Sequence, residues 1–129
     1  MLAAVAGCGG TPAPAGPSFS LLGSAVVDSV TQIEVAYASD TLTVRGTLIL
    51  PPGDDVRPAV VFNHGGVSGV SEDMKRRGRD LARLGYVVLA PAYRGEGGSQ
   101  GTVEVAAGEV DDVLNGAAIL AAHPRVDRA

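Results

Sequence analysis

The sequence of 129 residues contains no tryptophan, and aromatic residues make up only 4% of it. The core must therefore be built from Val, Leu and Ala, a composition that suits buried parallel strands and their covering helices. No apolar run approaches the roughly 20 residues that a membrane-spanning helix requires. Positive charge is also scarce, because 10 Lys and Arg residues face 14 Asp and Glu residues, leaving a formal net charge of −4. This balance argues against a nucleic-acid partner, which would need a basic surface.

The single cysteine, Cys8, has no partner for an internal disulfide. It follows the apolar tract LAAVAG and precedes a segment rich in Pro and Gly, a pattern that resembles the lipobox of bacterial lipoproteins. The resemblance implies a signal-like segment at 1–8, a linker at 9–25, and a lipid on Cys8 that anchors an exported protein to a membrane; a periplasmic or extracellular protein is also possible. A signal normally has a basic start and about 7 to 15 apolar residues, and neither is complete here. Either the signal begins upstream of Met1, or the match is incidental and the protein is cytoplasmic.

The foldable region is expected to begin near residue 26 with a hairpin. Runs rich in Val, Thr, Ile and Tyr predict strands at about 30–37 and 42–50. The short link at 38–40 allows only antiparallel pairing between them. After a break that contains Pro and Gly, the apolar run 59–62 predicts a central strand buried on both faces.

Two helices and one more strand are predicted beyond this point. Apolar residues at helical spacing predict a helix over 71–84, with Ser71 as its N-cap and Gly85 as its end. The apolar run 86–91 predicts a strand, and 103–122 predicts a second helix. The apolar face expected for the second helix consists of Val110, Val113, Leu114, Ala117, Ala118, Leu120 and Ala121. This alternation of strands and helices predicts parallel strands joined by right-handed crossovers.

Three segments of the sequence carry a resemblance to a known family. RPAVVFNHGG, DLARLGYVVLAPAYRGEGGS and AAHPRVDRA occur in this order over residues 57–129. They resemble the first half of an alpha/beta-hydrolase domain of the dienelactone hydrolase and prolyl oligopeptidase-like group. The resemblance implies an α/β fold in which residues 26–129 form the N-terminal part of an alpha/beta-hydrolase sheet, an antiparallel hairpin followed by parallel strands with crossover helices. Because the last segment is similar to the run-up to a further strand, we expect a truncated domain.

The turn after the predicted strand at 59–62 is the strongest candidate for chemistry. In the family, an H-G-G turn at this place supplies one backbone N–H to the oxyanion hole. The resemblance assigns this role to Gly66, with Val67 as the second candidate. His64 and Gly65 are expected to support the turn. Glycine suits the donor position because no side chain keeps the N–H from a developing negative oxygen. The alternative is a strand-to-helix turn that needs glycine for its geometry alone.

The loop after the strand at 86–91 resembles the rim of the active site in this family, with Tyr93 and Arg94 at its start. We expect Arg94 to hold the loop through a carboxylate such as Glu96 or Glu104, or alternatively to touch the substrate. His123 precedes a proline at a helix end and is expected to cap that helix. Neither histidine belongs to a cluster at metal-ligand spacing, so no metal site is expected, and the resemblance implies no cofactor.

The stretch GGSQG at 97–101 spells G-x-S-x-G, the pattern of the nucleophile elbow in many hydrolases. An elbow needs a strand directly before the serine and a helix directly after it. Ser99 is separated from the preceding strand and follows the fourth strand, whereas the family places its elbow after the fifth. Ser99 is therefore not expected to be the nucleophile. The resemblance places the nucleophile, the acid and the catalytic histidine beyond Ala129.

The resemblance implies a function in acyl transfer. We expect the chain to be the N-terminal fragment of a serine hydrolase, an esterase or peptidase acting on a small-molecule ester or peptide substrate. The fragment alone is expected to be inactive because it lacks the catalytic triad. A competing interpretation is a non-catalytic, lipid-anchored binding or interaction module with hydrolase-like architecture. A reading frame that continues into a strand and a G-x-S-x-G motif would favour the enzyme.

Overall fold

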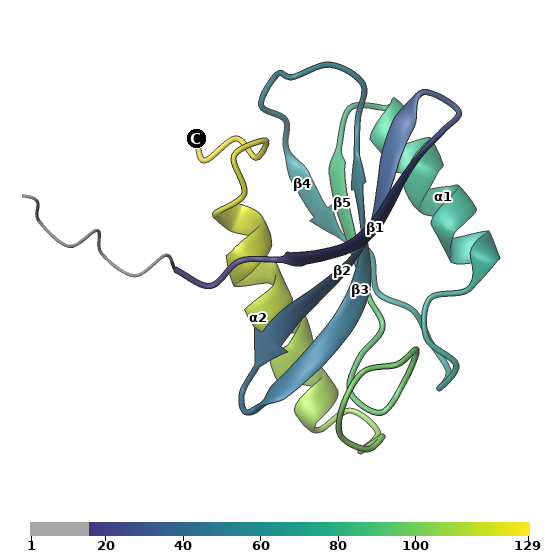
Figure 1. The fold of residues 1–129 in the computed structure, drawn as a ribbon, viewed down its shortest axis with the longest axis vertical. Coiled ribbons are helices and arrows are strands. Elements are labelled where there is room, and N and C mark those ends of the chain that lie inside the picture. Colours follow the sequence, from purple (N-terminus) through teal and green to yellow (C-terminus); the bar gives the residue numbers. More distant parts are fainter. Residues whose placement is uncertain (1–15) are drawn as a thin grey trace, which may run out of the picture.

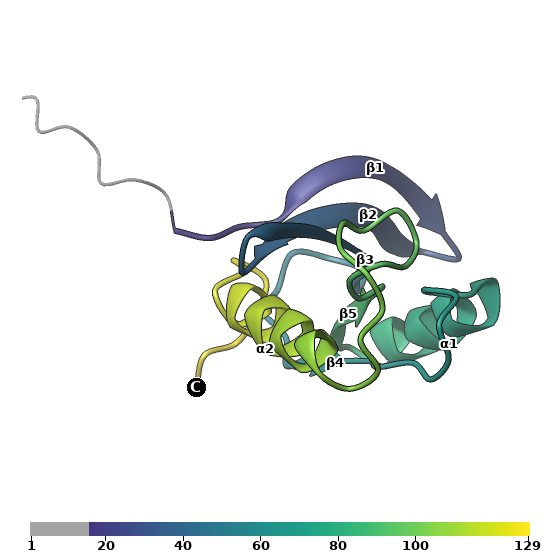
Figure 2. The same cartoon turned by 90° about the horizontal axis from the view of Figure 1, so that it is seen from below.

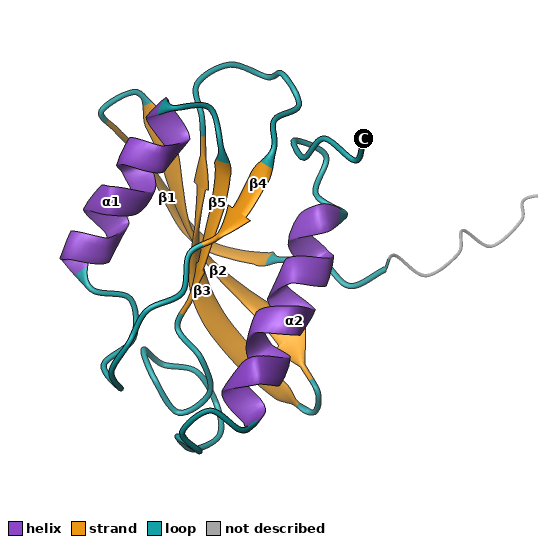
Figure 3. Ribbon diagram, turned by 180° about the vertical axis from the view of Figure 1, so that it is seen from behind, coloured by secondary structure: helices purple, strands orange, loops and turns teal. Residues whose placement is uncertain are grey.

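The computed structural model describes residues 16–129, so the predictions for Cys8 and for residues 1–8 lie outside the described residues. The described part is one five-stranded sheet with a helix on each face (Figure 1 and Figure 3). Its elements are β1 (Ser20–Val27), β2 (Val30–Ser39), β3 (Leu42–Leu50), β4 (Ala59–Val61), α1 (Glu72–Arg83), β5 (Val87–Pro91) and α2 (Gly108–Ala121). The strands lie in the order β1-β2-β3-β5-β4.

The sheet combines antiparallel and parallel pairs. β2 and β3 form the predicted antiparallel hairpin, and Asp40 adopts a φ of +52° in the tight turn between them. β3 is also antiparallel to β5, whereas β4 is parallel to β5. Since α1 connects β4 to β5, this parallel pair is a strand–helix–strand crossover. The predicted fold class, a hairpin followed by parallel strands with crossover helices, is confirmed.

β1 was not predicted, and the linker prediction is wrong for residues 20–25, which belong to this strand. Nearly all of β1 is exposed, so its side chains show no alternation between a buried and an exposed face. It is held instead by antiparallel pairing with β2 (Figure 2). Asp28 and Ser29 join the two strands with φ values of +49° and +68°. Two positive values in a two-residue link are typical of the type I′ hairpin turn.

β4 lies at an edge of the described sheet, which corrects the prediction of a central strand. Its three residues are only partly buried. Just before β4, Arg57 forms a parallel bridge with Val126. The Arg57 N–H donates to the Arg125 carbonyl at 2.8 Å, and the Asp127 N–H donates to the Arg57 carbonyl at 2.9 Å. The segment after α2 therefore pairs in a strand-like way with Arg57, just before β4 begins.

α1 begins and ends where the sequence predicts. The Ser71 hydroxyl accepts a hydrogen bond from the Met74 N–H at 3.3 Å, which satisfies one of the free donors of the first turn. Glu72 and Asp73 place negative charge at the positive end of the helix dipole. Gly85, with a φ of +101°, ends the helix.

α2 begins at Gly108, later than the predicted 103, and it presents a different face to the sheet. Val110 and Leu114, which were expected to be buried, are 51% and 61% exposed. Asp112 and Gly116 point inward instead. A methyl group on Gly116 would lie 3.0 Å from the Tyr37 hydroxyl, so the helix packs closely on β2 only because this residue is glycine.

The side chains of β5 alternate between the two faces of the sheet. Val88 packs with Ala82 of α1 on one face. Val87 and Leu89 pack with Leu120 of α2 on the other. All are at most 2% exposed, so β5 is buried on both faces, as its wholly apolar sequence predicts.

Candidate active site

The candidate site lies where the loops that follow β4 and β5 meet. Because these two strands are parallel, their carboxyl ends reach the same edge of the sheet, where open α/β sheets bind ligands. An open cleft of about 410 Å³ occupies this edge. Of the residues proposed for the site from sequence, the cleft is lined by His64, Gly65, Gly66, Val67 and Tyr93.

Tyr93 holds the turn after β4 through hydrogen bonds of its hydroxyl group. Its hydroxyl accepts a hydrogen bond from the His64 N–H at 3.0 Å. It lies 3.2 Å from both the Asn63 Oδ1 and the His64 carbonyl, the two acceptors available to its proton. Burial raises the pKa of the Tyr93 hydroxyl, so this proton stays in place at neutral pH. Tyr93 itself has a φ of +57°, a strained conformation that these contacts hold.

The His64 ring lies inside the turn, with its side chain 2% exposed. It stacks on the Tyr93 ring at a centroid distance of 4.3 Å and an angle of 20°. Nδ1 lies 3.2 Å from the Gly65 carbonyl, and Nε2 lies 3.4 Å from a Glu96 carboxylate oxygen without forming a hydrogen bond. These contacts tie the His64 ring to Tyr93 and to the turn itself, and its supporting role stays a prediction.

Glu96 belongs to the loop after β5, and its carboxylate is buried against the turn after β4. The residue is 4% exposed. Its carboxylate accepts a hydrogen bond from the Gly69 N–H at 3.0 Å. Glu96 was one of the two carboxylates expected to pair with Arg94, and the structure corrects this, because Glu96 faces His64 and Gly69 instead.

Gly66 and Val67 stand at the mouth of the cleft. Gly66 has a φ of +82°, and a methyl group placed on its Cα would meet no atom within 4 Å. Glycine is therefore required by the backbone conformation and not by crowding. Within residues 16–129, neither the Gly66 N–H nor the Val67 N–H donates a hydrogen bond.

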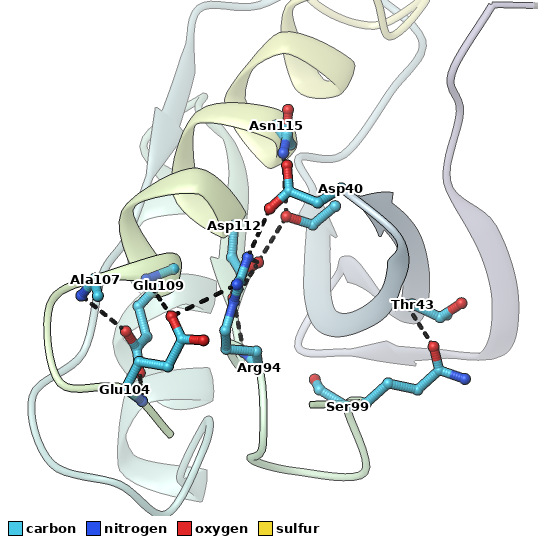
Figure 4. A network of polar contacts seen from close by, with 12 residues as sticks. Asp40, Thr43, Arg94, Ser99, Glu104, Ala107, Glu109, Asp112 and Asn115 are labelled. Atoms are coloured by element: carbon cyan, nitrogen blue, oxygen red, sulfur yellow. Dashed lines mark hydrogen bonds and ion pairs between the residues drawn. The ribbon is translucent and has the colours of Figure 1, made fainter. Parts of the chain in front are cut away.

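Arg94 does not line the cleft but anchors the loop after β5 to the body of the domain (Figure 4). It is 7% exposed. Its guanidinium lies 2.9 Å from Asp112, 3.0 Å from Asp40 and 3.6 Å from Glu104. Hydrogen bonds to Asp112 and Asp40 raise the pKa of Arg94. Of the two roles weighed for Arg94, the contacts match loop support, with Glu104 as one of its partners.

Asp112 was missed in the sequence, although it is fully buried. Its carboxylate accepts from the Arg94 N–H at 2.7 Å and from the Ser39 hydroxyl at 2.6 Å. Its carbonyl accepts from the Tyr37 hydroxyl at 2.9 Å. The spacing in the sequence could have indicated its burial. Asp112 lies four residues before Gly116 in a predicted helix, which places both residues on the same helix face.

A short apolar wall faces the turn after β4. Val103, Val105 and Val110 line this side of the cleft, and Val105 is 79% exposed. The Glu109 carboxylate accepts hydrogen bonds from backbone N–H groups of the segment before α2, at 2.6 Å from Glu104 and 3.1 Å from Val105. These hydrogen bonds, chiefly the one from Glu104, lower the pKa of Glu109. The predicted helical start at 103 is wrong because this capped loop takes its place.

Ser99 does not line the cleft. Its hydroxyl accepts a hydrogen bond from the Arg45 N–H of β3 at 2.8 Å, and its N–H donates to the Glu96 carbonyl at 2.7 Å. Next along the chain, the Gln100 N–H donates to the Thr43 carbonyl at 2.9 Å, and the Thr43 N–H donates to the Gln100 side-chain oxygen at 2.8 Å. The GGSQG stretch therefore closes a loop onto β3, and the strand–serine–helix geometry of an elbow is absent at Ser99.

His123 does not cap α2 through its side chain, which corrects the sequence prediction. Its Nδ1 accepts from the Arg125 N–H at 3.1 Å, and burial together with Arg125 lowers its pKa. In residues 16–129, no cluster of three His, Cys, Asp or Glu residues is arranged to hold a metal ion. Neither helix of the same region is long and apolar enough to cross a membrane.

One curated relative is 32% identical over 96 residues, the uncharacterized peptidase YtmA of Bacillus subtilis (strain 168). The match covers 73% of this chain but only 37% of the relative. No protein-family model matches the chain.

Solved structures share the fold at low sequence identity. Acetyl xylan esterase 1 from Thermoanaerobacterium sp. JW/SL YS485 matches 88% of this chain and 43% of its own, with a TM-score of 0.67 and 19% identity. A cold-adapted esterase from an Arctic intertidal metagenomic library matches 82% and 51%, with a TM-score of 0.66 and 20% identity. A dienelactone hydrolase-like promiscuous phosphotriesterase from metagenomic libraries matches 77% and 46%, with a TM-score of 0.57 and 21% identity. The fold is that of the N-terminal part of an alpha/beta hydrolase, and the chain spans about half or less of each of these proteins.

Proposed function

We propose that this chain is the N-terminal part of a serine hydrolase that cleaves an ester or peptide bond. One oxyanion donor is the Gly66 N–H, and the Val67 N–H is the alternative candidate for this same donor. The observation that carries this proposal is a pair of backbone N–H groups without a hydrogen-bond acceptor, in residues that line a cleft. The turn around them is held rigidly by Tyr93 and Glu96. Preorganised donors of this kind stabilise developing negative charge because they need no reorganisation during the reaction.

The proposed reaction is acyl transfer through a serine that lies outside these 129 residues. The serine Oγ attacks the substrate carbonyl while a histidine takes its proton, and the carbonyl oxygen becomes an oxyanion. The Gly66 N–H and the N–H after the nucleophile donate to that oxyanion. The alcohol or amine then leaves with the proton, and water hydrolyses the acyl-enzyme by the same steps. Ser99 is not used, because it does not line the cleft and its hydroxyl faces the Arg45 N–H of β3.

The names of the similar proteins support hydrolysis by acyl transfer, but they differ on whether the cleaved bond is an ester or a peptide bond. Two of the solved structures are esterases, and the curated relative is called a peptidase. The apolar wall of Val103, Val105 and Val110 suits an uncharged acyl or alcohol group. Specificity in this fold depends on residues that vary between proteins, so the bond must be settled by assay.

The test uses the protein translated from the reading frame extended past codon 129, with the 129-residue chain as control. The extended protein is assayed with p-nitrophenyl acetate and with a peptide p-nitroanilide. We expect turnover of at least one substrate by the extended protein and none by the 129-residue chain. A folded extended protein that turns over neither substrate would contradict the proposal and favour a non-catalytic binding module.

We also propose that Cys8 carries a lipid that anchors an exported protein to a membrane. Support comes from the sequence alone, the LAAVAGC tract and the Pro- and Gly-rich segment after it. Cells that express the protein are fed a clickable fatty acid, with Cys8→Ser as the matched control. Label on the native protein and none on the variant is the expected result. Equal labelling of the two proteins, or no label on either protein, would contradict the proposal that Cys8 carries a lipid.

A further inference from the structure

Two loops distant in sequence are tied together beside the cleft. The turn after β4 (63–69) meets the loop after β5 (93–101) through two independent connections. At one end, the Tyr93 hydroxyl accepts the His64 N–H at 3.0 Å. At the other end, the Glu96 carboxylate accepts the Gly69 N–H at 3.0 Å. Gly66 lies in the short segment between these two fixed points.

The backbone of Glu96 is connected to β3 by hydrogen bonds through Ser99. The Glu96 carbonyl accepts the Ser99 N–H at 2.7 Å, and the Ser99 hydroxyl in turn accepts the Arg45 N–H of β3 at 2.8 Å. The two loops also approach closely, since a methyl group on Gly69 would lie 3.3 Å from the Gly97 backbone. A buried carboxylate anchored to the sheet therefore determines where the far end of the turn lies.

Burying this carboxyl group is costly unless hydrogen bonds or nearby charges replace its lost hydration. Within residues 16–129 no Lys or Arg pairs with Glu96. The carboxylate accepts the Gly69 N–H, and it lies 3.4 Å from the His64 Nε2 without a hydrogen bond between them. Both contacts act on the turn that carries Gly66.

We propose that Glu96 is a positioning residue that holds the Gly66 N–H in the orientation an oxyanion requires. The inference rests on the proposed function, because it assigns Glu96 a role in the same site. Glu96 acts through the Gly69 N–H and the His64 ring. Loss of its carboxylate frees one end of the turn while the Tyr93 end stays tied, so the donor loses its fixed orientation and the fold is retained.

The activity test compares Glu96→Ala, Glu96→Gln and the control Glu34→Ala in the extended protein. Glu34 is matched because its carboxylate also joins two elements, accepting from the Thr47 hydroxyl at 3.1 Å and from the Lys75 Nζ at 2.7 Å, but it touches neither loop of the site. We expect Glu96→Ala to lower kcat about 10- to 100-fold with KM changed less than about threefold, the pattern of an interaction used in the transition state. Glu96→Gln, whose amide oxygen can still accept the Gly69 N–H, should recover most of the loss. Glu34→Ala should keep kcat within about twofold.

A second measurement separates the positioning role from the proposed function. Amide hydrogen exchange and ¹⁵N chemical shifts are recorded on the 129-residue chain, where no turnover is needed. We expect Glu96→Ala to speed exchange at Gly69 about tenfold and to shift the Gly66 amide, and Glu34→Ala to change neither. If these changes appear but the extended protein has no activity, the proposed function fails and the loop tether stands. A folded Glu96→Ala protein with an unchanged Gly66 amide, or with unchanged kcat in an active enzyme, would overturn the positioning role.

Discussion

Asp112→Ala removes the buried carboxylate that anchors the loop after β5, and it should destabilise the domain strongly. Asp112 is fully buried, and its loss leaves the Arg94 guanidinium, 7% exposed, without its main partner. Breaking a buried ion pair from one side typically costs about 3 to 5 kcal/mol. Arg94 keeps Asp40 and Glu104, whose side chains are 52% and 43% exposed and therefore pair more weakly. The lower end of the range, about 3 kcal/mol, is the expected loss of unfolding free energy.

The assay is urea unfolding followed by circular dichroism, together with a thermal melt. For a domain of this size, about 3 kcal/mol corresponds to a fall in Tm of roughly 12 °C. Asp111→Ala is the matched control, because it removes the same charge from the neighbouring exposed position. The double variant Arg94→Met with Asp112→Leu should cost less than the sum of its two single changes, since no buried charge is left unpaired. A loss below about 1 kcal/mol for Asp112→Ala would refute the assignment of Asp112 as the anchor.

Two further predictions concern other parts of the fold. Because burial lowers the pKa of His123 below its ordinary 6.5, the unfolded chain binds the proton more readily, and His123 stabilises the fold above pH 6.5 but not as the pH falls through this range. His123→Asn keeps a side-chain acceptor for the Arg125 N–H, so its urea midpoint should fall less between pH 7.5 and 5.5 than that of the native chain; equal slopes would contradict this reasoning. Gly95→Ala should cost at least roughly 2 kcal/mol, because its φ is +75° and the new methyl group would lie 2.5 Å from the Val103 nitrogen. Gly53→Ala, with a φ of +81° and open space around it, should cost only about 1 kcal/mol, and equal costs would show that the contact at Gly95 is relieved by small shifts.

The elements that could be predicted are those whose signal is local. β5 is a wholly apolar run between turns, and α1 has a capping serine, acidic residues in its first turn and a glycine at its end. Such signals depend on a few neighbouring residues. β1 gives no such signal, because nearly every side chain is exposed and its strand state comes from pairing with β2.

The turn 64–67 could be singled out from the sequence and lines the cleft, but the side-chain partners around it were missed. The roles proposed for Gly66 and His64 stay predictions. The partners of Arg94 and Glu96 depend on which loops meet in space, and Asp112 lies 18 residues after Arg94. The start of α2 was misplaced because Glu104 and Glu109, both good helix formers, here accept hydrogen bonds from loop N–H groups.

The identity of the reactive serine tests the proposed function most directly. The extended protein is treated with a fluorophosphonate probe, digested, and mapped by mass spectrometry to find the modified residue. We predict a single adduct on a serine within a G-x-S-x-G motif beyond Ala129, with Ser99 unmodified and with unchanged labelling in Ser99→Ala. An adduct on Ser99, or no adduct on the folded extended protein, would contradict the account of this chain as the oxyanion-bearing part of a serine hydrolase.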